Sequence, residues 1–149
     1  MTRTSTYTWF CANQSITIGA RTLLMGVLNV TPDSFSDGGT YANIDLAVQH
    51  ALDMHARGAD IIDIGGESSR PGAEPVSEHE EMDRTIPVIR ALRDKLDCPI
   101  SIDTTKSGVA RAAIQAGVDI INDISACRLD PEMIPLAAES GAGLVLMHM

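Results

Sequence analysis

The strongest candidate for chemistry in this chain is a polar segment that directly follows an apolar run of strand type. The apolar run is Leu23 to Leu28, and the segment behind it reads Asn29-Val-Thr-Pro-Asp-Ser-Phe-Ser-Asp-Gly-Gly39. An ordinary connection takes about 4–6 residues. This one is longer and includes an aromatic, Phe35, that turn chemistry does not require. We therefore expect a ligand-binding loop at the C-terminal end of a strand, where α/β sheets bind their ligands.

Polar residues also end the later apolar runs. They are Asp63, Asp103, Asn122 and His148, and we assign no role to the last. In an all-parallel barrel the ends of the strands converge on one mouth. Two carboxylates and two carboxamides there, counting that of Asn29, would suit a small, nitrogen-rich heterocycle, because these groups pair with ring N–H donors and ring acceptors.

An anionic group on such a ligand would need a local cation, because the chain has a formal net charge of -9. The candidates among the side chains are Arg70, Lys106 and Arg128. A Mg²⁺ ion held partly by the side-chain oxygen of Asn29 is a further candidate.

The elements that must position these residues alternate along the chain. Two short runs, 6–10 and 15–18, predict an N-terminal β-hairpin. Apolar residues at helical spacing then alternate with short apolar runs, which predicts helices and strands in turn. The predicted strands are 23–28, 61–64, 99–102, 119–122 and 143–147, and the predicted helices are 44–56, 77–96, 109–116 and 131–139.

This alternation predicts an α/β fold built on a parallel sheet. Five strands could form a flavodoxin-like open sheet, or they could belong to a (β/α)8 TIM barrel truncated after about five β/α strands. The last predicted strand has no covering helix after it, which would leave an unpaired edge. We therefore expect residues 1–149 to be a single, incomplete domain from the N-terminal part of a barrel, with the hairpin in front of it.

Composition excludes several classes of function. The acidic balance and a content of 3% aromatic residues argue against a nucleic-acid surface. No apolar run approaches the ~18 residues of a membrane span. The three cysteines are far apart and odd in number, which indicates thiols of a reducing compartment rather than disulfides or a zinc site. We expect a soluble, cytoplasmic protein.

Four motifs together resemble dihydropteroate synthase. They are Asn29 to Gly39, Ile62-Asp-Ile-Gly-Gly-Glu-Ser-Ser-Arg-Pro-Gly-Ala73, Ser101-Ile-Asp-Thr104 and Ile120-Ile-Asn-Asp123. The resemblance implies a pterin-binding TIM barrel of folate biosynthesis, usually a homodimer and the target of sulfonamides. It implies that p-aminobenzoate is joined to 6-hydroxymethyl-7,8-dihydropterin diphosphate, giving 7,8-dihydropteroate and pyrophosphate.

The resemblance also implies roles for individual residues. Asn29 would help to coordinate Mg²⁺ on the diphosphate. The pterin ring would contact Asp103 and Asn122, with Asp63 beside them. Ser69, where the family often has Thr, would contact the diphosphate.

Two loops that close over the site are implied as well. In them Phe35 and Pro71 would help to form the p-aminobenzoate pocket, Asp37 would stabilise developing positive charge, and Arg70 would hold the loops and the pyrophosphate. The later glycine-rich segment, the Lys and the Arg-x-His of the family are absent, so we expect the 149-residue chain alone to have little or no synthase activity.

Two alternatives stay open at this point. One is a pterin-binding methyltransferase of the methyltetrahydrofolate type, which should lack the loop from Asn29 to Gly39. The other is a half-barrel that binds pterin, or pairs with a partner chain, without catalysis.

Overall fold

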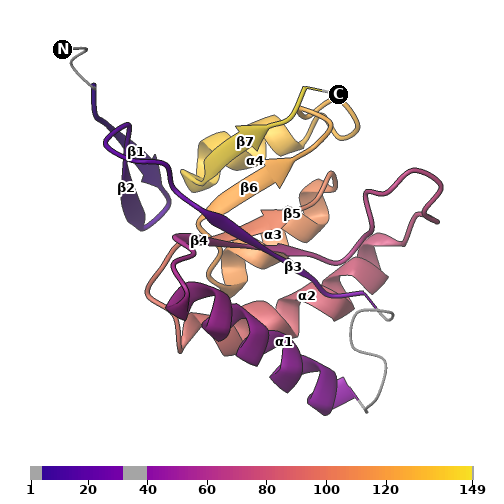
Figure 1. Ribbon diagram of the computed structural model, residues 1–149. Helices are drawn as coiled ribbons and strands as arrows, with labels where there is room; N and C mark the ends of the chain where they lie inside the picture. Colours follow the sequence, from indigo (N-terminus) through magenta and orange to yellow (C-terminus); the bar gives the residue numbers. More distant parts are fainter. Residues whose placement is uncertain (1–4, 32–39, 149) are drawn as a thin grey trace.

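The computed structural model describes residues 5–31 and 40–148, with side chains from residue 43 onward in the second range. A two-stranded hairpin precedes a five-stranded sheet, and four helices follow the first four strands of that sheet (Figure 1). The strands are β1 (Tyr7–Cys11), β2 (Gln14–Ile18), β3 (Met25–Asn29), β4 (Ile61–Gly65), β5 (Ile100–Asp103), β6 (Ile120–Asp123) and β7 (Gly143–Leu146). The helices are α1 (Thr40–Ala56), α2 (Glu78–Arg93), α3 (Ser107–Ala116) and α4 (Met133–Ser140).

The strand order of the sheet decides between the two predicted architectures. Its order is β3-β4-β5-β6-β7, and every neighbouring pair is parallel. A flavodoxin-like sheet has the order 2-1-3-4-5, whereas a barrel adds its strands in sequence order. The prediction of an N-terminal hairpin followed by part of a TIM barrel is therefore confirmed, and the open doubly wound sheet is excluded.

One face of the sheet packs against the helices through a continuous apolar layer. Side chains alternate along each strand, so β4 and β5 send Ile62, Ile64, Ile100 and Ile102 into this layer, all four fully buried. The opposite face carries the residues between them, among which Asp63 and Ser101 are paired in register. The sheet therefore separates an apolar outer layer from a polar inner face.

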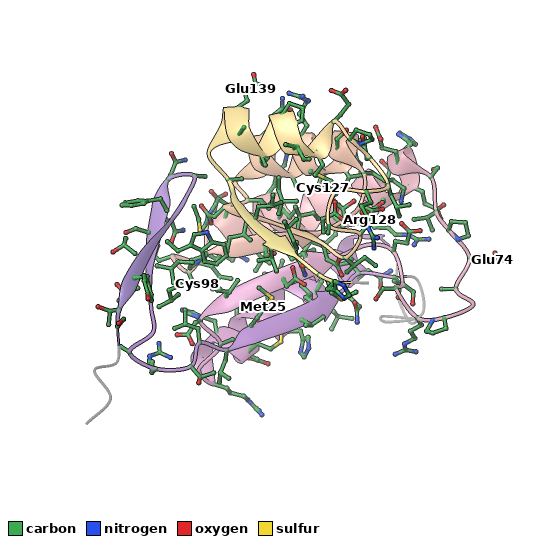
Figure 2. All side chains as sticks on the ribbon, turned by 90° about the horizontal axis from the view of Figure 1, so that it is seen from above. Met25, Glu74, Cys98, Cys127, Arg128 and Glu139 are labelled. Carbon is green, nitrogen blue, oxygen red and sulfur yellow. The ribbon has the colours of Figure 1, made fainter. Side chains whose placement is uncertain are left out.

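The hairpin covers the N-terminal end of the inner face. Cys11 and Ile16 from the hairpin form a small buried cluster with Ile61 and Ile120 at the starts of β4 and β6. Figure 2 places the hairpin at one end of the sheet and Glu74 at the other. The chain thus closes one end of the half-barrel with apolar side chains, and the polar strand ends lie at the opposite end.

A repeated Gly-x-Asp step enters β4 and β6. Asp60 accepts a hydrogen bond of 2.9 Å from the backbone N–H of Leu24, and Asp119 accepts one of 3.0 Å from that of Ile100. Each acid therefore ties its own strand to the start of the strand before it, which gives both Gly-x-Asp steps, 58–60 and 117–119, the same structural role.

Helix α2 begins as predicted but buries an unexpected residue. The Ser77 side chain accepts a hydrogen bond of 3.1 Å from the Glu80 N–H, as an N-cap should. The Glu80 carboxylate pairs with Arg84 at 2.5 Å. The buried face of α2 includes Glu81, whereas its apolar neighbour Met82 is only half-buried.

Two predictions about residue classes also have outcomes. Cys11, Cys98 and Cys127 are buried, free thiols. None of the helices within residues 5–31 and 40–148 combines the length and the apolar character that a membrane crossing requires.

Candidate functional site

One row of residues crosses four strands at the C-terminal end of the sheet. Asn29 is in register with Gly65, Gly65 with Asp103, and Asp103 with Asn122. Residues in register on parallel strands point to the same face. The three polar side chains predicted from separate motifs therefore share one level of the inner face.

Gly65 leaves a gap in this row. A Cβ at this position would lie 3.6 Å from Asp103 Oδ2 and 3.9 Å from Asn29 Oδ1. These are ordinary contact distances, so no clash requires glycine here. The missing side chain instead opens space between the Asn29 amide and the Asp103 carboxylate, where a ligand can approach both groups.

Asp63 lies one level deeper, on the row that continues to Ser101. It is 3% exposed and accepts a hydrogen bond of 3.1 Å from Asn122 Nδ2. Burial raises the pKa of Asp63, while the nearby Ser101 hydroxyl and the Asn122 amide act to lower it. Asp63 Oδ1 and Ser101 Oγ are buried and make no hydrogen bond of regular geometry. These two atoms lie side by side beneath the row of Asn29, Asp103 and Asn122.

Asp103 sits in an environment of strong negative charge. Burial, and after it the charge of neighbouring acids, raises the pKa of Asp103 from 3.8 to about 7. The neighbouring acids are Asp63, Glu81, Asp123 and Glu67. Near neutral pH this carboxyl group can therefore donate or accept a hydrogen bond, according to its protonation state.

Two adjoining hollows connect the row to the loop between β4 and α2. The larger, of about 870 Å³, is bordered by Asn29, Ser69, Arg70 and Pro71. The smaller, of about 150 Å³, is bordered by Ser69 and Asp103 among others. Ser69 lines both, so the structure brings five of the predicted site residues around two hollows that share a wall.

The loop residues in this depression are exposed. Ser69, Arg70 and Pro71 all belong to the exposed class. The Arg70 N–H donates a hydrogen bond of 3.3 Å to Ser68 Oγ, and its carbonyl accepts one of 3.1 Å from the Ala73 N–H. The loop backbone is therefore turned by local hydrogen bonds, while the Arg70 side chain faces solvent beside the hollow.

Lys106 does not lie open to an anion, which corrects its place among the candidate cations. Its Nζ pairs with Glu67 Oε2 and, at 2.7 Å, with Glu81 Oε2. Neither glutamate was among the sequence-based site candidates. The available signal was Glu81 itself, because it is in helical phase with Thr85, Val88 and Leu92, all of which are buried.

Four other residues complete the account of the predictions. Arg128 is exposed, and its Nε donates a hydrogen bond of 3.2 Å to the Ser125 carbonyl. His148 is exposed beyond the end of β7. Phe35 and Asp37 lie outside the described residues.

The described residues offer no cage for a metal ion. Within 5–31 and 40–148, no group of three or more His, Cys, Asp or Glu side chains could hold one. Asn29 contributes a single oxygen beside the gap at Gly65. This donor set suits Mg²⁺ only where a ligand's phosphates and water supply most of the coordination, which is the usual protein mode for that ion.

Known proteins match this chain over most of its length. It is 56% identical over 131 residues to the dihydropteroate synthase of Synechocystis sp., an alignment of 88% of this chain and 45% of that protein. The structure of Xanthomonas albilineans dihydropteroate synthase with 4-aminobenzoic acid matches with a TM-score of 0.90 and 46% identity, over 97% of this chain and 52% of that one. The same enzyme in complex with 7,8-dihydropteroate matches with a TM-score of 0.84 and 43% identity, over 96% of this chain and 51% of that one.

The chain spans about half the length of the relatives it matches. The family model described as pterin binding enzyme matches residues 25–149, which include every strand of the parallel sheet. It ends with the last residue of the chain and begins with β3, so only the hairpin and its connection lie outside it. The chain therefore belongs to the pterin binding enzyme family.

Proposed function

We propose that this chain is the N-terminal part of a dihydropteroate synthase, a transferase of folate biosynthesis. The reaction joins p-aminobenzoate to 6-hydroxymethyl-7,8-dihydropterin diphosphate. The C–O bond to the diphosphate breaks, the aryl amine forms a C–N bond to the pterin methylene carbon and loses a proton, and pyrophosphate leaves. The relatives with 4-aminobenzoic acid and 7,8-dihydropteroate in their titles support this assignment.

The single observation that carries the proposal is the row of Asn29, Gly65, Asp103 and Asn122 beside the loop with Ser69 and Arg70. It places groups that can read a heterocycle next to groups that can hold an anion. A pterin diphosphate has these two parts in one molecule.

The pterin ring is assigned to the inner face. Asp103 and Asn122 would pair with its amino, N–H and carbonyl groups, and Asp63, already bonded to Asn122, would fix the amide's orientation. Carboxylates near the methylene carbon would also stabilise positive charge that develops there as the diphosphate departs. The negative surroundings that raise the pKa of Asp103 suit that role.

The diphosphate is assigned to the hollow lined by Asn29, Ser69 and Arg70. Arg70 would supply the positive charge and Ser69 a hydroxyl donor. A Mg²⁺ ion bound there would neutralise charge on the leaving pyrophosphate, with Asn29 as its one protein ligand among the described residues.

The p-aminobenzoate pocket is assigned to the β4–α2 loop and to the segment before α1. Pro71 from the β4–α2 loop and Phe35 from the segment before α1 would form its apolar walls. Asp37 would stabilise the cation that develops at the pterin methylene carbon. Arg70 would hold the loops together, and the closed loops would exclude water that could capture this cation. These assignments rest on the motifs, since Phe35 and Asp37 lie outside the described residues.

The two alternatives differ in specific features. A methyltetrahydrofolate-type methyltransferase should lack the segment from Asn29 to Gly39, and this chain has it. A non-enzymatic half-barrel would bind pterin but not p-aminobenzoate. A cytoplasmic location and a homodimer of the full-length protein stay predictions, which cell fractionation and size-exclusion chromatography would test.

Calorimetry with the purified chain tests the proposal. The pterin diphosphate should bind with Mg²⁺ present, and p-aminobenzoate should bind only after pyrophosphate or the pterin diphosphate has been added. Asp103→Asn should weaken pterin binding by about tenfold, because hydrogen bonds to charged groups contribute about 1.5–3 kcal/mol. Asp45→Asn, an exposed acid on α1, is the matched control. Equal affinity of the two variants would refute the assignment of the pterin to this face.

A further inference from the structure

The loop between β4 and α2 is closed at its base by one carboxylate. Glu67 lies at the start of the loop, and its Oε1 accepts a hydrogen bond of 3.4 Å from the backbone N–H of Val76, at the far end. Its Oε2 pairs with Lys106 Nζ at the start of α3. Glu67 therefore joins the two ends of the segment that carries Ser69 and Arg70.

Lys106 also pairs with a second carboxylate, that of Glu81. Glu81 is fully buried on α2, and its Oε2 accepts from Lys106 Nζ at 2.7 Å. Its other oxygen, Oε1, is buried with no hydrogen-bond partner. A buried carboxylate so poorly satisfied depends on the charge of Lys106. Burial alone would lower the pKa of Lys106, but its bonds with Glu67 and Glu81 outweigh this effect and raise the pKa. Lys106 therefore stays positively charged.

Gly66 fixes the first turn of the loop against α2. Arg84 Nη1 donates a hydrogen bond of 2.8 Å to the Gly66 carbonyl. A Cβ on Gly66 would lie 2.8 Å from Thr85 Cγ2 and 3.2 Å from the Glu81 carbonyl oxygen. The start of the loop is therefore packed tightly, whereas residues 69–75 beyond Glu67 and Ser68 are exposed.

From this geometry we propose that Glu67 is a positioning residue that fixes the β4–α2 loop and is itself held by Lys106 and Glu81. The fixed loop keeps Ser69 and Arg70 at the larger hollow, to which the diphosphate is assigned. The proposal deepens the proposed function and rests on it for the identity of the anion. Glu67 acts through the loop backbone and touches no ligand in this scheme. Its loss should weaken binding of the diphosphate part of the substrate much more than that of the pterin part, on which Glu67 acts only through its charge near Asp103.

Backbone relaxation of the ¹⁵N-labelled chain tests the anchoring without any ligand. In the wild type the amides of Ser68 and Val76 should have order parameters near those of rigid backbone, about 0.85. In Glu67→Gln, which keeps the size of the side chain and removes its charge, they should fall below about 0.6. Glu74→Gln is the matched control, because Glu74 lies exposed in the same loop (Figure 2) and makes no hydrogen bond or ion pair with the part of the chain that the structure describes.

A second variant tests whether Lys106 supplies the anchor. Lys106→Met alone would leave Glu81 buried and unpaired, so the chain could unfold for that reason. The double variant Lys106→Met with Glu81→Met removes both charges and fills the space with apolar groups of similar size. It should fold, as judged by unchanged amide shifts in β4 to β6, and should loosen the loop as Glu67→Gln does.

Two ligand probes separate positioning from a general structural role. Mg²⁺ with inorganic pyrophosphate should bind Glu67→Gln about tenfold more weakly than wild type, whereas the affinity for 6-hydroxymethylpterin should change much less. Unchanged order parameters in Glu67→Gln would overturn the anchoring. Loosened amides with unchanged pyrophosphate affinity would overturn the assignment of this loop to the diphosphate and thus that part of the proposed function. Equal weakening for both probes would overturn the selective role of Glu67.

Discussion

The side-chain amide of Asn122 on β6 donates a hydrogen bond of 3.1 Å to the carboxylate of Asp63 on β4. Strand β5 lies between these two strands, so the bond crosses the inner face above Ser101. It orients the Asn122 amide and satisfies one oxygen of a carboxylate that is 3% exposed. The pair of Asp63 and Asn122 therefore belongs to the inner face to which the pterin ring is assigned, and it also stabilises that polar face.

Replacing Asn122 should destabilise the fold. Asn122→Leu removes the donor and leaves the Asp63 carboxylate without the one regular hydrogen bond that it makes to a described side chain. We expect a loss of about 1–3 kcal/mol of unfolding free energy, the cost of an unsatisfied buried polar group. Urea denaturation measures it. Gln115→Leu, which removes an exposed amide on α3, should change stability by less than about 0.5 kcal/mol. Equal stability of the two variants would contradict this prediction.

The pH dependence of stability should reveal Asp103. Its pKa is about 7 in the folded chain, and an unfolded Asp has one near 3.9. Between these values the folded state binds more protons than the unfolded state, so stability falls as pH rises from about 4 to about 7. Asp103→Asn removes this contribution. The urea midpoint of wild type should therefore decline relative to that of the variant across this window, and parallel curves would refute the raised pKa.

The sequence predicted the fold and the polar row well for a physical reason. Strand ends of a parallel sheet meet at one edge, so Asn29, Asp103 and Asn122 could be grouped without knowing the register. Helix signals are equally local, since Ser77, the first residue of the predicted helix 77–96, caps α2. Element ends shifted by a few residues, as in β3, which runs from Met25 to Asn29 rather than from 23 to 28.

The ionic support of the site could not be predicted in the same way. Glu67, Glu81 and Lys106 come from the β4–α2 loop, α2 and the start of α3, and only packing brings them together. Each charge alone resembles an ordinary surface group. The burial of Glu81 depends on the rotation of α2 against the sheet, which apolar residues at helical spacing predict only approximately.

A methyl group should mainly reduce stability at Gly66 and mainly weaken ligand binding at its neighbour Gly65. Gly66→Ala should cost about 1–3 kcal/mol of stability, because its Cβ would meet Thr85 Cγ2 at 2.8 Å. Gly65→Ala should cost less, since its nearest contacts would be at 3.6 Å, but it should weaken pterin diphosphate binding by filling the gap beside Asp103. Urea midpoints and calorimetry separate the two effects. The reverse order of stability would contradict the packing described for Gly66.

A methyl group should also disrupt the contact between β7 and the hairpin. Gly143 begins β7, and a Cβ there would lie 2.6 Å from Cys11 Sγ and 2.8 Å from Trp9 Cζ2. Gly143→Ala should therefore push the hairpin away from the end of the sheet, at a cost of about 1–3 kcal/mol. Trp9 is the one tryptophan of the chain, so its emission should shift to the red as its ring gains water. Gly65→Ala, at the other end of the sheet, should leave the emission unchanged. If both variants kept the wild-type spectrum, the contact of Gly143 with Cys11 and Trp9 would not hold the hairpin. The apolar cluster around Ile16 would then close the N-terminal end of the half-barrel by itself.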